Sequence, residues 1–374
     1  MKPLIHVIAA ARPNFMKVAP LVRALRAEAW CETELVHTGQ HYDAAMSDAF
    51  FRDLSIPRPD HHLEVGSGTH AEQTAGVMVA YEKVCLARRP DWIIVVGDVN
   101  STVACALVGA KLCIPVAHLE AGLRSGDRTM PEEINRVVTD SIADLLWTPS
   151  PDGDENLSRE GRGHCVERVG NIMIDTFVSL RDRIEATRSH EAHGLARGDY
   201  GVVTLHRPAN VDHEDTLTAL VDGLVSVASE TPLVFPVHPR TRKMLATFGL
   251  LNRLEAAPGL TLTEPLGYID FMGLVTGARL VITDSGGVQE ETTFLGIPCL
   301  TLRPNTERPI TITEGSNRLV TPADLSRAAH AALAAGPRTA PPPALWDGQT
   351  AARVVASLKR RVMGTAAETA AVSA

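Results

Sequence analysis

The sequence predicts an α/β protein built from two domains, each with a parallel sheet. Short runs rich in Ile and Val alternate with helical segments, as is typical of buried parallel strands and their crossover helices. The alternation runs from Leu4 to about Asn171, and a second series begins at Tyr200. With 374 residues, the chain is too long for one ordinary hydrophobic core.

Composition narrows the class of protein. The chain has 45% hydrophobic and 21% charged residues, which is normal for a soluble globular protein. A net charge of −8 argues against nucleic acid as the main partner. The six cysteines show no CxxC pair and lie mostly in apolar segments, which favours buried thiols over a metal site or disulfide framework. We recognise neither a signal peptide nor an apolar run of membrane-spanning length, so a cytoplasmic protein without a membrane partner is expected.

The first strand, residues 4–10, leads into a loop with Arg12 and Lys17 and then a helix over residues 18–28. This joint has no glycine fingerprint and resembles neither the dinucleotide-binding turn nor the P-loop. Two cations at a helix N-terminus favour an anion. A solvated Lys17 fits this segment equally well.

The next strand, residues 34–38, ends at Gln40 and His41. His41 is either a ligand contact or an ordinary helix-start residue. His61 and His62 follow near a Pro-rich turn and are expected to be structural or exposed. A helix is predicted over residues 70–87.

The most informative stretch runs from Trp92 to Asp140. A strand over residues 92–97 is followed by Asp98, and a second strand over residues 114–119 is followed by Glu120. A helix starting at Pro131 adds Glu132, Glu133 and Arg136. Ligands of open α/β sheets lie beyond the carboxyl ends of the strands, and acids gathered there suit proton transfer. Solvated turn residues are the alternative, but interleaved arginines at 124, 128 and 136 make it less favoured.

The second series repeats this pattern. Strands over residues 201–205 and 233–237 end at His206 with Arg207, and at His238. Further strands are predicted over residues 145–148, 166–169, 260–262, 280–283 and 299–302, the last of these being the last clear strand. A final helix covers residues 349–361, and the Ala-rich tail, residues 365–374, is expected to be disordered.

A glycine-containing joint opens the helix after residues 280–283. Gly286 and Gly287 let the backbone approach a ligand, and Ser285 adds a hydroxyl where free N–H groups suit phosphate. Glu290 or Glu291 would then accept from ribose hydroxyls. With Arg303 and Arg308 beyond the next strand, the joint indicates a nucleoside diphosphate site.

These residues carry a family resemblance over residues 3–325. The matching pieces are ARPNFMK at 11–17, TGQHYD at 38–43, GDVNST at 97–102, HLEAGLRSGD at 118–127, MPEEINR at 130–136, VGN at 169–171, TLHRPANVD at 204–212, PVHPR at 236–240, TDSGGVQEE at 283–291 and ERP at 307–309. In this order they resemble the non-hydrolysing UDP-N-acetylglucosamine 2-epimerase family. Their number makes the resemblance specific, although no single piece would.

The resemblance implies a GT-B-type fold, with two Rossmann-like domains facing across a cleft and a C-terminal helix crossing back to the first. The implied domains are residues 1–171 with 349–374, and residues 172–348. The implied enzyme is an isomerase that interconverts UDP-N-acetylglucosamine and UDP-N-acetylmannosamine by anti elimination of UDP to a glycal and re-addition. No metal or nicotinamide cofactor is implied, and family members are often homodimers.

Positions carry over residue by residue. The resemblance assigns catalysis to Asp98, Glu120, Glu132 and His206. Asp98 and Glu120 are expected to handle protons in the elimination, and the other two to serve re-addition or the leaving group. The implied UDP contacts are Arg12, Lys17, Arg136, Phe271, Ser285, Gly286, Gly287, Glu291 and Arg308. Without the family, Phe271 would be assigned to core packing.

Two departures from the family pattern bear on substrate and regulation. Residues 65–69 lack the arginine that holds a second UDP-N-acetylglucosamine in regulated members, although Gln40, Arg207 and His238 stand at matching places. Allosteric activation is therefore not favoured. The short loop over residues 124–131 is similar to that of relatives acting on UDP-2,3-diacetamido-glucuronate. The carboxylate of that sugar would need a cation in the pocket, which Arg124 or Arg128 would supply. A UDP-sugar-dependent glycosyltransferase, a hydrolytic epimerase and a non-enzymatic sensor of UDP-sugar are further alternatives.

Overall fold

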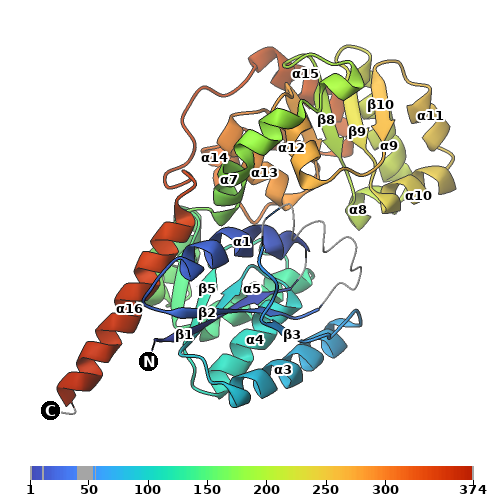
Figure 1. Ribbon diagram of the computed structural model, residues 1–374. Helices are drawn as coiled ribbons and strands as arrows, with labels where there is room; N and C mark the ends of the chain where they lie inside the picture. Colours follow the sequence, from blue (N-terminus) through green and yellow to red (C-terminus); the bar gives the residue numbers. More distant parts are fainter. Residues whose placement is uncertain (1, 11, 40–53, 55, 373–374) are drawn as a thin grey trace. The chain divides into compact units, whose positions relative to one another are not determined.

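The computed structural model describes residues 2–10, 12–39, 54 and 56–372, without the side chains of residues 12–13 and 365–372. Contacts divide the chain into unit 1, residues 1–178 with 344–374, and unit 2, residues 179–343. Each unit has a parallel sheet flanked by helices (Figure 1). The predicted α/β class with two parallel sheets is confirmed.

The sheet of unit 1 has the strand order β3-β2-β1-β4-β5-β6-β7. Its strands are β1 Leu4–Ala9, β2 Glu32–His37, β3 His61–His62, β4 Trp92–Val96, β5 Val116–Leu119, β6 Leu145–Thr148 and β7 Val166–Arg168. All neighbouring strands pair in parallel. The order reverses between β1 and β4, which is the place where such sheets bind ligands.

Helices cover both faces of this sheet (Figure 1). They are α1 Arg12–Arg26, α3 His70–Ala87, α4 Asn100–Lys111, α5 Pro131–Ile142, α6 Pro151–Arg159 and α16 Thr350–Val372. Helix α7, Ile172–Thr187, begins in unit 1 and continues past residue 178 into unit 2. On one face, Ile8 and Val36 pack into a buried cluster with Tyr81 of α3 and Ala104 of α4. The face toward α1 is marked by Phe15, whose ring centroid lies 5.3 Å from that of His37.

Helix α1 begins at Arg12, earlier than the predicted start at residue 18. A proline near a helix start costs little because the N–H it lacks would be unpaired there, so Pro13 does not delay the helix. Pro20 lies inside the helix and cannot donate to Met16. The hydroxyl of Thr176 donates to that carbonyl instead. Lys17 therefore lies beyond the first turn rather than at the helix N-terminus.

The C-terminal helix α16 belongs to unit 1, as predicted. Its start is held by Asp175, whose carboxylate accepts from the N–H groups of Thr350 at 3.0 Å and Ala351 at 2.7 Å. Further along, Trp147 Nε1 donates to Ser357 Oγ at 2.9 Å. The helix continues to Val372, so the expectation of a disordered tail was wrong for residues 365–372. Ala has the highest intrinsic helix propensity, and the tail extends a helix that has already formed.

The sheet of unit 2 has the order β10-β9-β8-β11-β12-β13. The strands are β8 Gly201–Thr204, β9 Leu233–Pro236, β10 Leu260–Thr263, β11 Leu280–Thr283, β12 Cys299–Thr301 and β13 Asn317–Leu319. The helices are α8 Pro208–Val211, α9 Glu214–Ala228, α10 Pro239–Thr247, α11 Leu251–Glu255, α12 Tyr268–Val275, α13 Gly286–Leu295, α14 Ile310–Thr313 and α15 Leu325–Ala335. Short 3₁₀ turns lie at Gly163–Cys165, Glu191–His193 and Pro322–Asp324.

Strand β13 was not predicted. Asn-Arg-Leu shows no apolar run, and the strand exists because β12 offers it a parallel partner. Asn317 is tied down by its side chain, which donates to Gln289 Oε1 at 3.0 Å and accepts from Thr301 Oγ1 at 2.6 Å.

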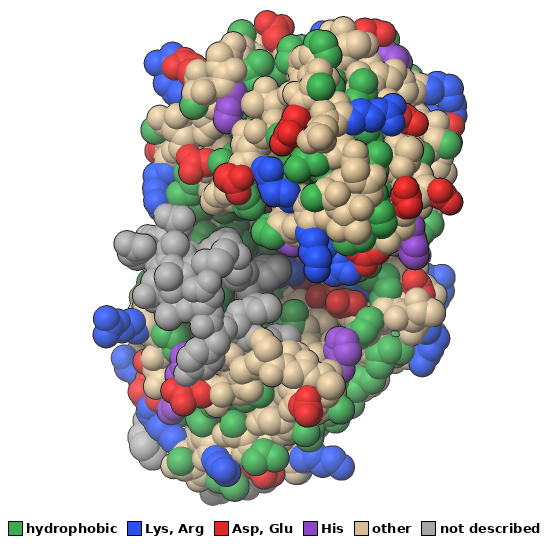
Figure 2. Space-filling model, turned by 90° about the vertical axis from the view of Figure 1, so that its right-hand side faces the viewer, with side chains coloured by type: hydrophobic (Ala, Val, Ile, Leu, Met, Phe, Trp, Pro, Cys, Tyr) green, Lys and Arg blue, Asp and Glu red, His purple; other side chains and the backbone are tan. Residues whose placement is uncertain are grey.

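The remaining features concern the surface and the cysteines. The six thiols are free, and all are buried except Cys113. Basic and acidic side chains of the described residues are interspersed on the face that Figure 2 shows. Among the described residues, no helix has both the length and the apolar character that crossing a bilayer requires.

Candidate active site

Two predicted catalytic carboxylates lie at the ends of adjacent strands. Asp98 follows β4 and Glu120 follows β5, and the register pairs Val96 with Leu119. Glu120 is buried and has a φ of 75°, a left-handed conformation that a non-glycine residue adopts only when its surroundings hold it. Its Oε2 forms an ion pair with Lys17 Nζ of α1. A buried carboxylate is therefore matched by a buried ammonium.

Gly97 leaves room for this pair. Its φ is 71°, and a Cβ there would lie 3.2 Å from Lys17 Nζ and 3.3 Å from Glu120 Oε2. The backbone thus passes close to both charged groups because residue 97 has no side chain.

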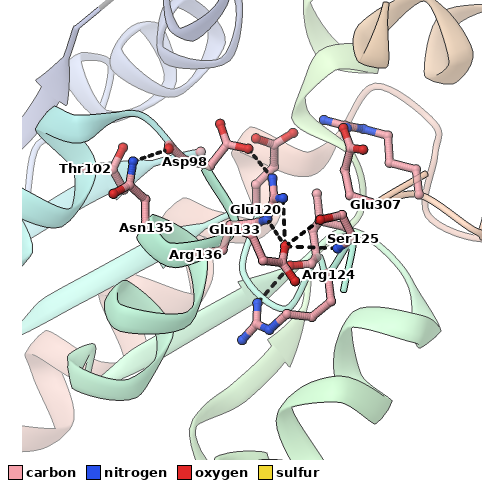
Figure 3. A network of polar contacts seen from close by, with 12 residues as sticks. Asp98, Thr102, Glu120, Arg124, Ser125, Glu133, Asn135, Arg136 and Glu307 are labelled. Carbon is pink, nitrogen blue, oxygen red and sulfur yellow. Dashed lines mark hydrogen bonds and ion pairs between the residues drawn. The ribbon is translucent and has the colours of Figure 1, made fainter. Parts of the chain in front are cut away.

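Asp98 is held by helix α5 (Figure 3). Arg136 donates from Nη1 to its carboxylate, and Asn135 donates to its backbone carbonyl at 2.9 Å. Arg136 is almost fully buried, while the side chain of Asp98 keeps 29% of its surface exposed. Two residues of α5 therefore orient Asp98, and its side chain remains partly exposed.

Two neighbouring glutamates of α5, Glu132 and Glu133, have different environments. Glu133 is buried and accepts from the N–H groups of Ser125 at 3.0 Å and Gly126 at 2.9 Å, and from Arg136 Nη2 at 2.8 Å (Figure 3). Burial opposes ionisation of Glu133, but these donors outweigh it and hold its pKa below the ordinary value. Glu132 is half-buried at the start of the same helix. Glu133 therefore fastens the loop before α5, and Glu132 is the more accessible carboxylate.

Arg124 is engaged in ion pairs within unit 1. Its Nη1 donates to Asp140 Oδ2 at 2.7 Å, and its Nε and Nη2 donate to Glu160 at 2.8 and 2.7 Å. A bidentate pair of this kind fixes the plane of the guanidinium. Arg128, by contrast, is exposed. Both arginines line an open pocket of about 420 Å³.

A buried histidine, His118, connects the ends of β4 and β5 to helix α5. His118 Nδ1 lies 2.6 Å from Asp140 Oδ1, and its Nε2 lies 2.8 Å from the carbonyl oxygen of Gly97. His118 and Asp140 are both fully buried. Burial opposes ionisation of Asp140, but His118 and Arg124 more than offset it and lower its pKa. Both ring nitrogens of His118 therefore lie within hydrogen-bond distance of oxygen atoms, one on α5 and one at the end of β4.

In unit 2, a buried aspartate organises the segment after β8. Asp284 accepts from the N–H of His206 at 3.0 Å and of Arg207 at 2.9 Å, and from Asn210 Nδ2 at 3.0 Å. Its Oδ1 also lies 3.0 Å from His206 Nδ1, and the histidine side chain is 40% exposed. Burial opposes ionisation of Asp284, but these donors lower its pKa. Asp284 thereby orients the His206 ring through Nδ1.

The start of α13 is where the sequence predicts an anion site. Ser285 precedes the helix without capping it through its side chain, so its hydroxyl and the first N–H groups are not used by a cap. A Cβ on Gly286 would lie 3.0 Å from both Arg308 Nη1 and Glu307 Oε1. Arg308 in turn pairs with Glu307 and, at 2.8 Å, with Glu290 Oε1. A buried guanidinium is thus fixed beside a helix N-terminus.

Glu291 has a different environment from its neighbour Glu290. It is buried, and Tyr268 of α12 donates to its Oε1 at 2.8 Å. Burial raises the pKa of Glu291 to about 8, although the Tyr268 hydroxyl acts in the opposite direction. Phe271 lies one turn further along α12 and is half-buried.

Of the other predicted site residues, His238 is exposed, and three lie wholly or partly outside the described residues. His238 is exposed and caps α10, accepting from the N–H of Arg240 at 3.2 Å. Its ring centroid lies 5.6 Å from that of His206. The side chain of Arg12, and Gln40 and His41 entirely, lie outside the described residues.

Some residues that sequence reasoning did not assign contact the predicted site residues within each unit. They are His118, Asp140, Tyr268, Asp284 and Glu307. His118 and Asp284 stand inside the motifs at 118–127 and 283–291, which gave a positional signal. Asp140 and Tyr268 had none, because their partners are 22 and 23 residues away in sequence.

Unit 1 has oriented carboxylates at its strand ends, and unit 2 has a helix start with a buried arginine beside it. Two parallel α/β units of this kind define the class of nucleotide-sugar enzymes with paired Rossmann-like domains. The chain belongs to the UDP-N-acetylglucosamine 2-epimerase family, whose family model matches residues 23–359.

Individual relatives agree with this assignment. UDP-N-acetylglucosamine 2-epimerase of Methanocaldococcus jannaschii is 42% identical over 322 residues, which is 84% of this chain and 88% of that protein. UDP-2,3-diacetamido-2,3-dideoxy-D-glucuronate 2-epimerase of Pseudomonas aeruginosa is 40% identical over 321 residues, again 84% and 88%. The crystal structure of the M. jannaschii enzyme with UDP-GlcNAc and UDP superposes with a TM-score of 0.85 at 39% identity, covering 95% of this chain and 99% of that one.

Proposed function

We propose that this protein is a UDP-N-acetylglucosamine 2-epimerase that forms UDP-N-acetylmannosamine reversibly. The observation that carries the proposal is the pair Asp98 and Glu120, at adjacent strand ends and each ion-paired to a cation. Inversion at carbon 2 needs proton removal on one face of the sugar and proton delivery on the other. Two separately held carboxylates suit that requirement.

Unit 2 is proposed to bind the UDP moiety. The first N–H groups of α13, with Ser285, Gly286 and Gly287, would receive the diphosphate, and Arg308 would supply positive charge. Glu291 would accept from ribose hydroxyls, and Phe271 would line the uracil pocket. Arg12, Lys17 and Arg136 of unit 1 remain proposed diphosphate contacts, the last two already paired with Glu120 and Asp98.

The chemistry proceeds in two steps. A carboxylate, Asp98 or Glu120, takes the proton from carbon 2 while the bond from carbon 1 to the UDP oxygen breaks. The electrons of the C2–H bond form the C1–C2 double bond, and UDP departs with the C–O electron pair. UDP then adds back to carbon 1, and carbon 2 receives a proton on its opposite face. No oxidant or reductant is consumed, so the balance closes with the chain's own groups.

His206 and Glu132 are proposed to serve the second step or the departing UDP. Asp284 holds His206 Nδ1, so the ring would exchange a proton with the ligand through Nε2. Glu132 is half-buried beside the fastened Glu133 and is open to a ligand. Gln40, His41, Arg207 and His238 are proposed only as secondary sugar contacts.

One observation favours a second substrate, UDP-2,3-diacetamido-glucuronate. The P. aeruginosa relative named for it is 40% identical to this chain. Its additional carboxylate would need a cation. Arg124 is engaged by Asp140 and Glu160, so the exposed Arg128 is the better candidate.

The test is proton NMR of the purified protein in deuterated water with each UDP-sugar in turn. UDP-N-acetylmannosamine carrying deuterium at carbon 2 would support the first substrate. Free N-acetylmannosamine with UDP would indicate a hydrolytic epimerase instead. Turnover of the diacetamido-glucuronate sugar alone, reduced in Arg128→Met, would select the second substrate. No turnover of either sugar would favour a glycosyltransferase or a sensor.

We further propose a cytoplasmic homodimer that supplies an activated amino sugar to polysaccharide or secondary-metabolite synthesis. The family resemblance supports the dimer, because family members are often homodimers. Light scattering of the eluting protein would give a mass of about twice 40.2 kDa for the dimer. A mass of one chain at working concentration would contradict it.

A further inference from the structure

Three side chains gather at the edge of the unit 1 sheet, away from the strand ends described above. They are His6 of β1, Glu34 of β2 and His61 of β3. His6 and Glu34 are paired residues in the parallel register, and His61 follows through the pairing of β3 with Val36. Three neighbouring strands thus each supply one side chain to the same face.

The ligating atoms of these residues converge. Glu34 Oε2 lies 3.1 Å from His6 Nε2 and 2.9 Å from His61 Nε2. One such atom from each residue lies within 4.8 Å of the other two. Zinc bonds of about 2.0–2.2 Å in a tetrahedron separate neighbouring ligand atoms by about 3.3 Å. An ion would therefore fit with shifts of a few tenths of an ångström.

The surrounding groups orient these ligands. Tyr81 Oη lies 3.1 Å from His6 Nδ1, so His6 turns Nε2 toward Glu34. Arg88 donates to the other oxygen of Glu34, which leaves Oε2 facing the two histidines. Arg88 also pairs with Glu32, so two carboxylates share one guanidinium and the local charge favours a cation. Such supporting contacts are typical of metal sites.

The three side chains differ in their exposure to solvent. The side chain of His6 is fully buried, that of Glu34 is 13% exposed and that of His61 is 31% exposed. An ion could enter from the side of His61, where water would complete its coordination.

We propose that His6, Glu34 and His61 bind one divalent first-row transition ion, with zinc as the best fit, and that the ion is structural. Two imidazoles and one carboxylate are ligands that zinc accepts. The ion would fasten the two-residue strand β3 to β1 and β2. It takes no part in the epimerisation, so the inference does not depend on the proposed function.

The first experiment is calorimetric titration of tag-free, chelator-treated full-length protein with zinc chloride. We expect saturable binding of one ion per chain in the micromolar range or tighter, with a higher melting temperature. Cobalt should give visible absorption bands of a low-coordinate site. His61→Ala should weaken zinc binding at least tenfold.

His62→Ala is the matched control. His62 faces His37 instead: its Nε2 lies 2.9 Å from His37 Nδ1, and the two rings are tilted by 51° at a centroid distance of 4.7 Å. This variant loses a neighbouring histidine of the same strand and should keep the tight zinc site. Circular dichroism of both variants would establish that each is folded.

Two outcomes would overturn the inference. One is the absence of saturable binding up to millimolar zinc, which would leave the cluster as histidines hydrogen-bonded to Glu34. The other is an equal loss of binding in His61→Ala and His62→Ala, which would place the metal elsewhere. Epimerase turnover of chelator-treated protein is measured separately and should equal that of untreated protein.

Discussion

His118 Nε2 lies 2.8 Å from the carbonyl oxygen of Gly97, the residue that precedes Asp98. Through its other nitrogen, the same ring contacts Asp140 of α5. The ends of β4 and β5 and the middle of α5 are therefore joined by one buried imidazole. We infer that His118 is a positioning residue for Asp98, since it holds the backbone just before the carboxylate.

The first prediction concerns His118→Gln. Glutamine cannot donate to both acceptors at once, so the Gly97 carbonyl or Asp140 loses a partner and Asp98 shifts. We expect kcat to fall at least tenfold while KM changes less than about twofold, because misplacement by about 1 Å can cost two orders of magnitude in rate. Steady-state kinetics would measure both. Trp147→Phe is the control, because it removes a different buried hydrogen bond, the one to Ser357 of α16. If this control lowers kcat and stability as much as His118→Gln does, the role of His118 is only structural.

The second prediction separates Glu132 from Glu133. Glu133→Gln removes a buried charge that holds Arg136 and the loop before α5, so we expect a loss of about 2–4 kcal/mol in the free energy of unfolding. Glu132→Gln should leave stability within about 0.5 kcal/mol and reduce kcat strongly. Urea denaturation and turnover assays would be run on both variants. The reverse pattern would transfer the proposed catalytic role to Glu133.

The third prediction compares two glycines with positive φ. Gly97→Ala and Gly161→Ala both place a Cβ at a left-handed position, which costs roughly 1–2 kcal/mol. A Cβ at 97 meets Lys17 and Glu120, whereas one at 161 meets nothing within 4 Å. Stability should therefore fall in both and further in Gly97→Ala, while activity falls more than tenfold only in Gly97→Ala. Unchanged activity of Gly97→Ala would show that the Lys17–Glu120 geometry does not limit the reaction.

The fourth prediction concerns the pH dependence of stability. The pKa of Glu291 is about 8 in the folded protein, against an ordinary value of 4.5. Between these values the unfolded chain loses the proton while the folded protein keeps it, so folding is increasingly disfavoured as pH rises from about 5 to 8. Glu291→Gln removes this dependence, and its stability relative to the parent protein should increase over that range by up to a few kcal/mol.

Urea titrations at pH 5, 6.5 and 8 would measure this difference. Glu314→Gln is the control, because Glu314 is exposed. A difference between Glu291→Gln and the parent that stays constant from pH 5 to 8 would contradict the raised pKa.

Much of the fold follows from local sequence patterns. Runs such as residues 92–96 and 280–283 are short, apolar and β-branched, and they form strands buried on both faces. Helix α3 has the predicted bounds because Thr69 and Glu72 form a capping box before it. Local patterns failed at β13, which forms because β12 offers a parallel partner. They also failed at the start of α1, where Pro13 in the first turn does not delay the helix.

The sequence by itself determined the class, most of the order of strands and helices apart from β3 and β13, and the charged residues at the strand ends. It could do so because apolar periodicity and the rule for carboxyl ends of parallel strands act over a few residues. Tertiary structure alone decided which charge each group faces: Lys17 reaches Glu120 across 103 residues, and Asp284 reaches His206 across 78. The pKa of a buried carboxyl depends on those distant partners and on the water it has lost, and neither is encoded in its immediate sequence neighbours.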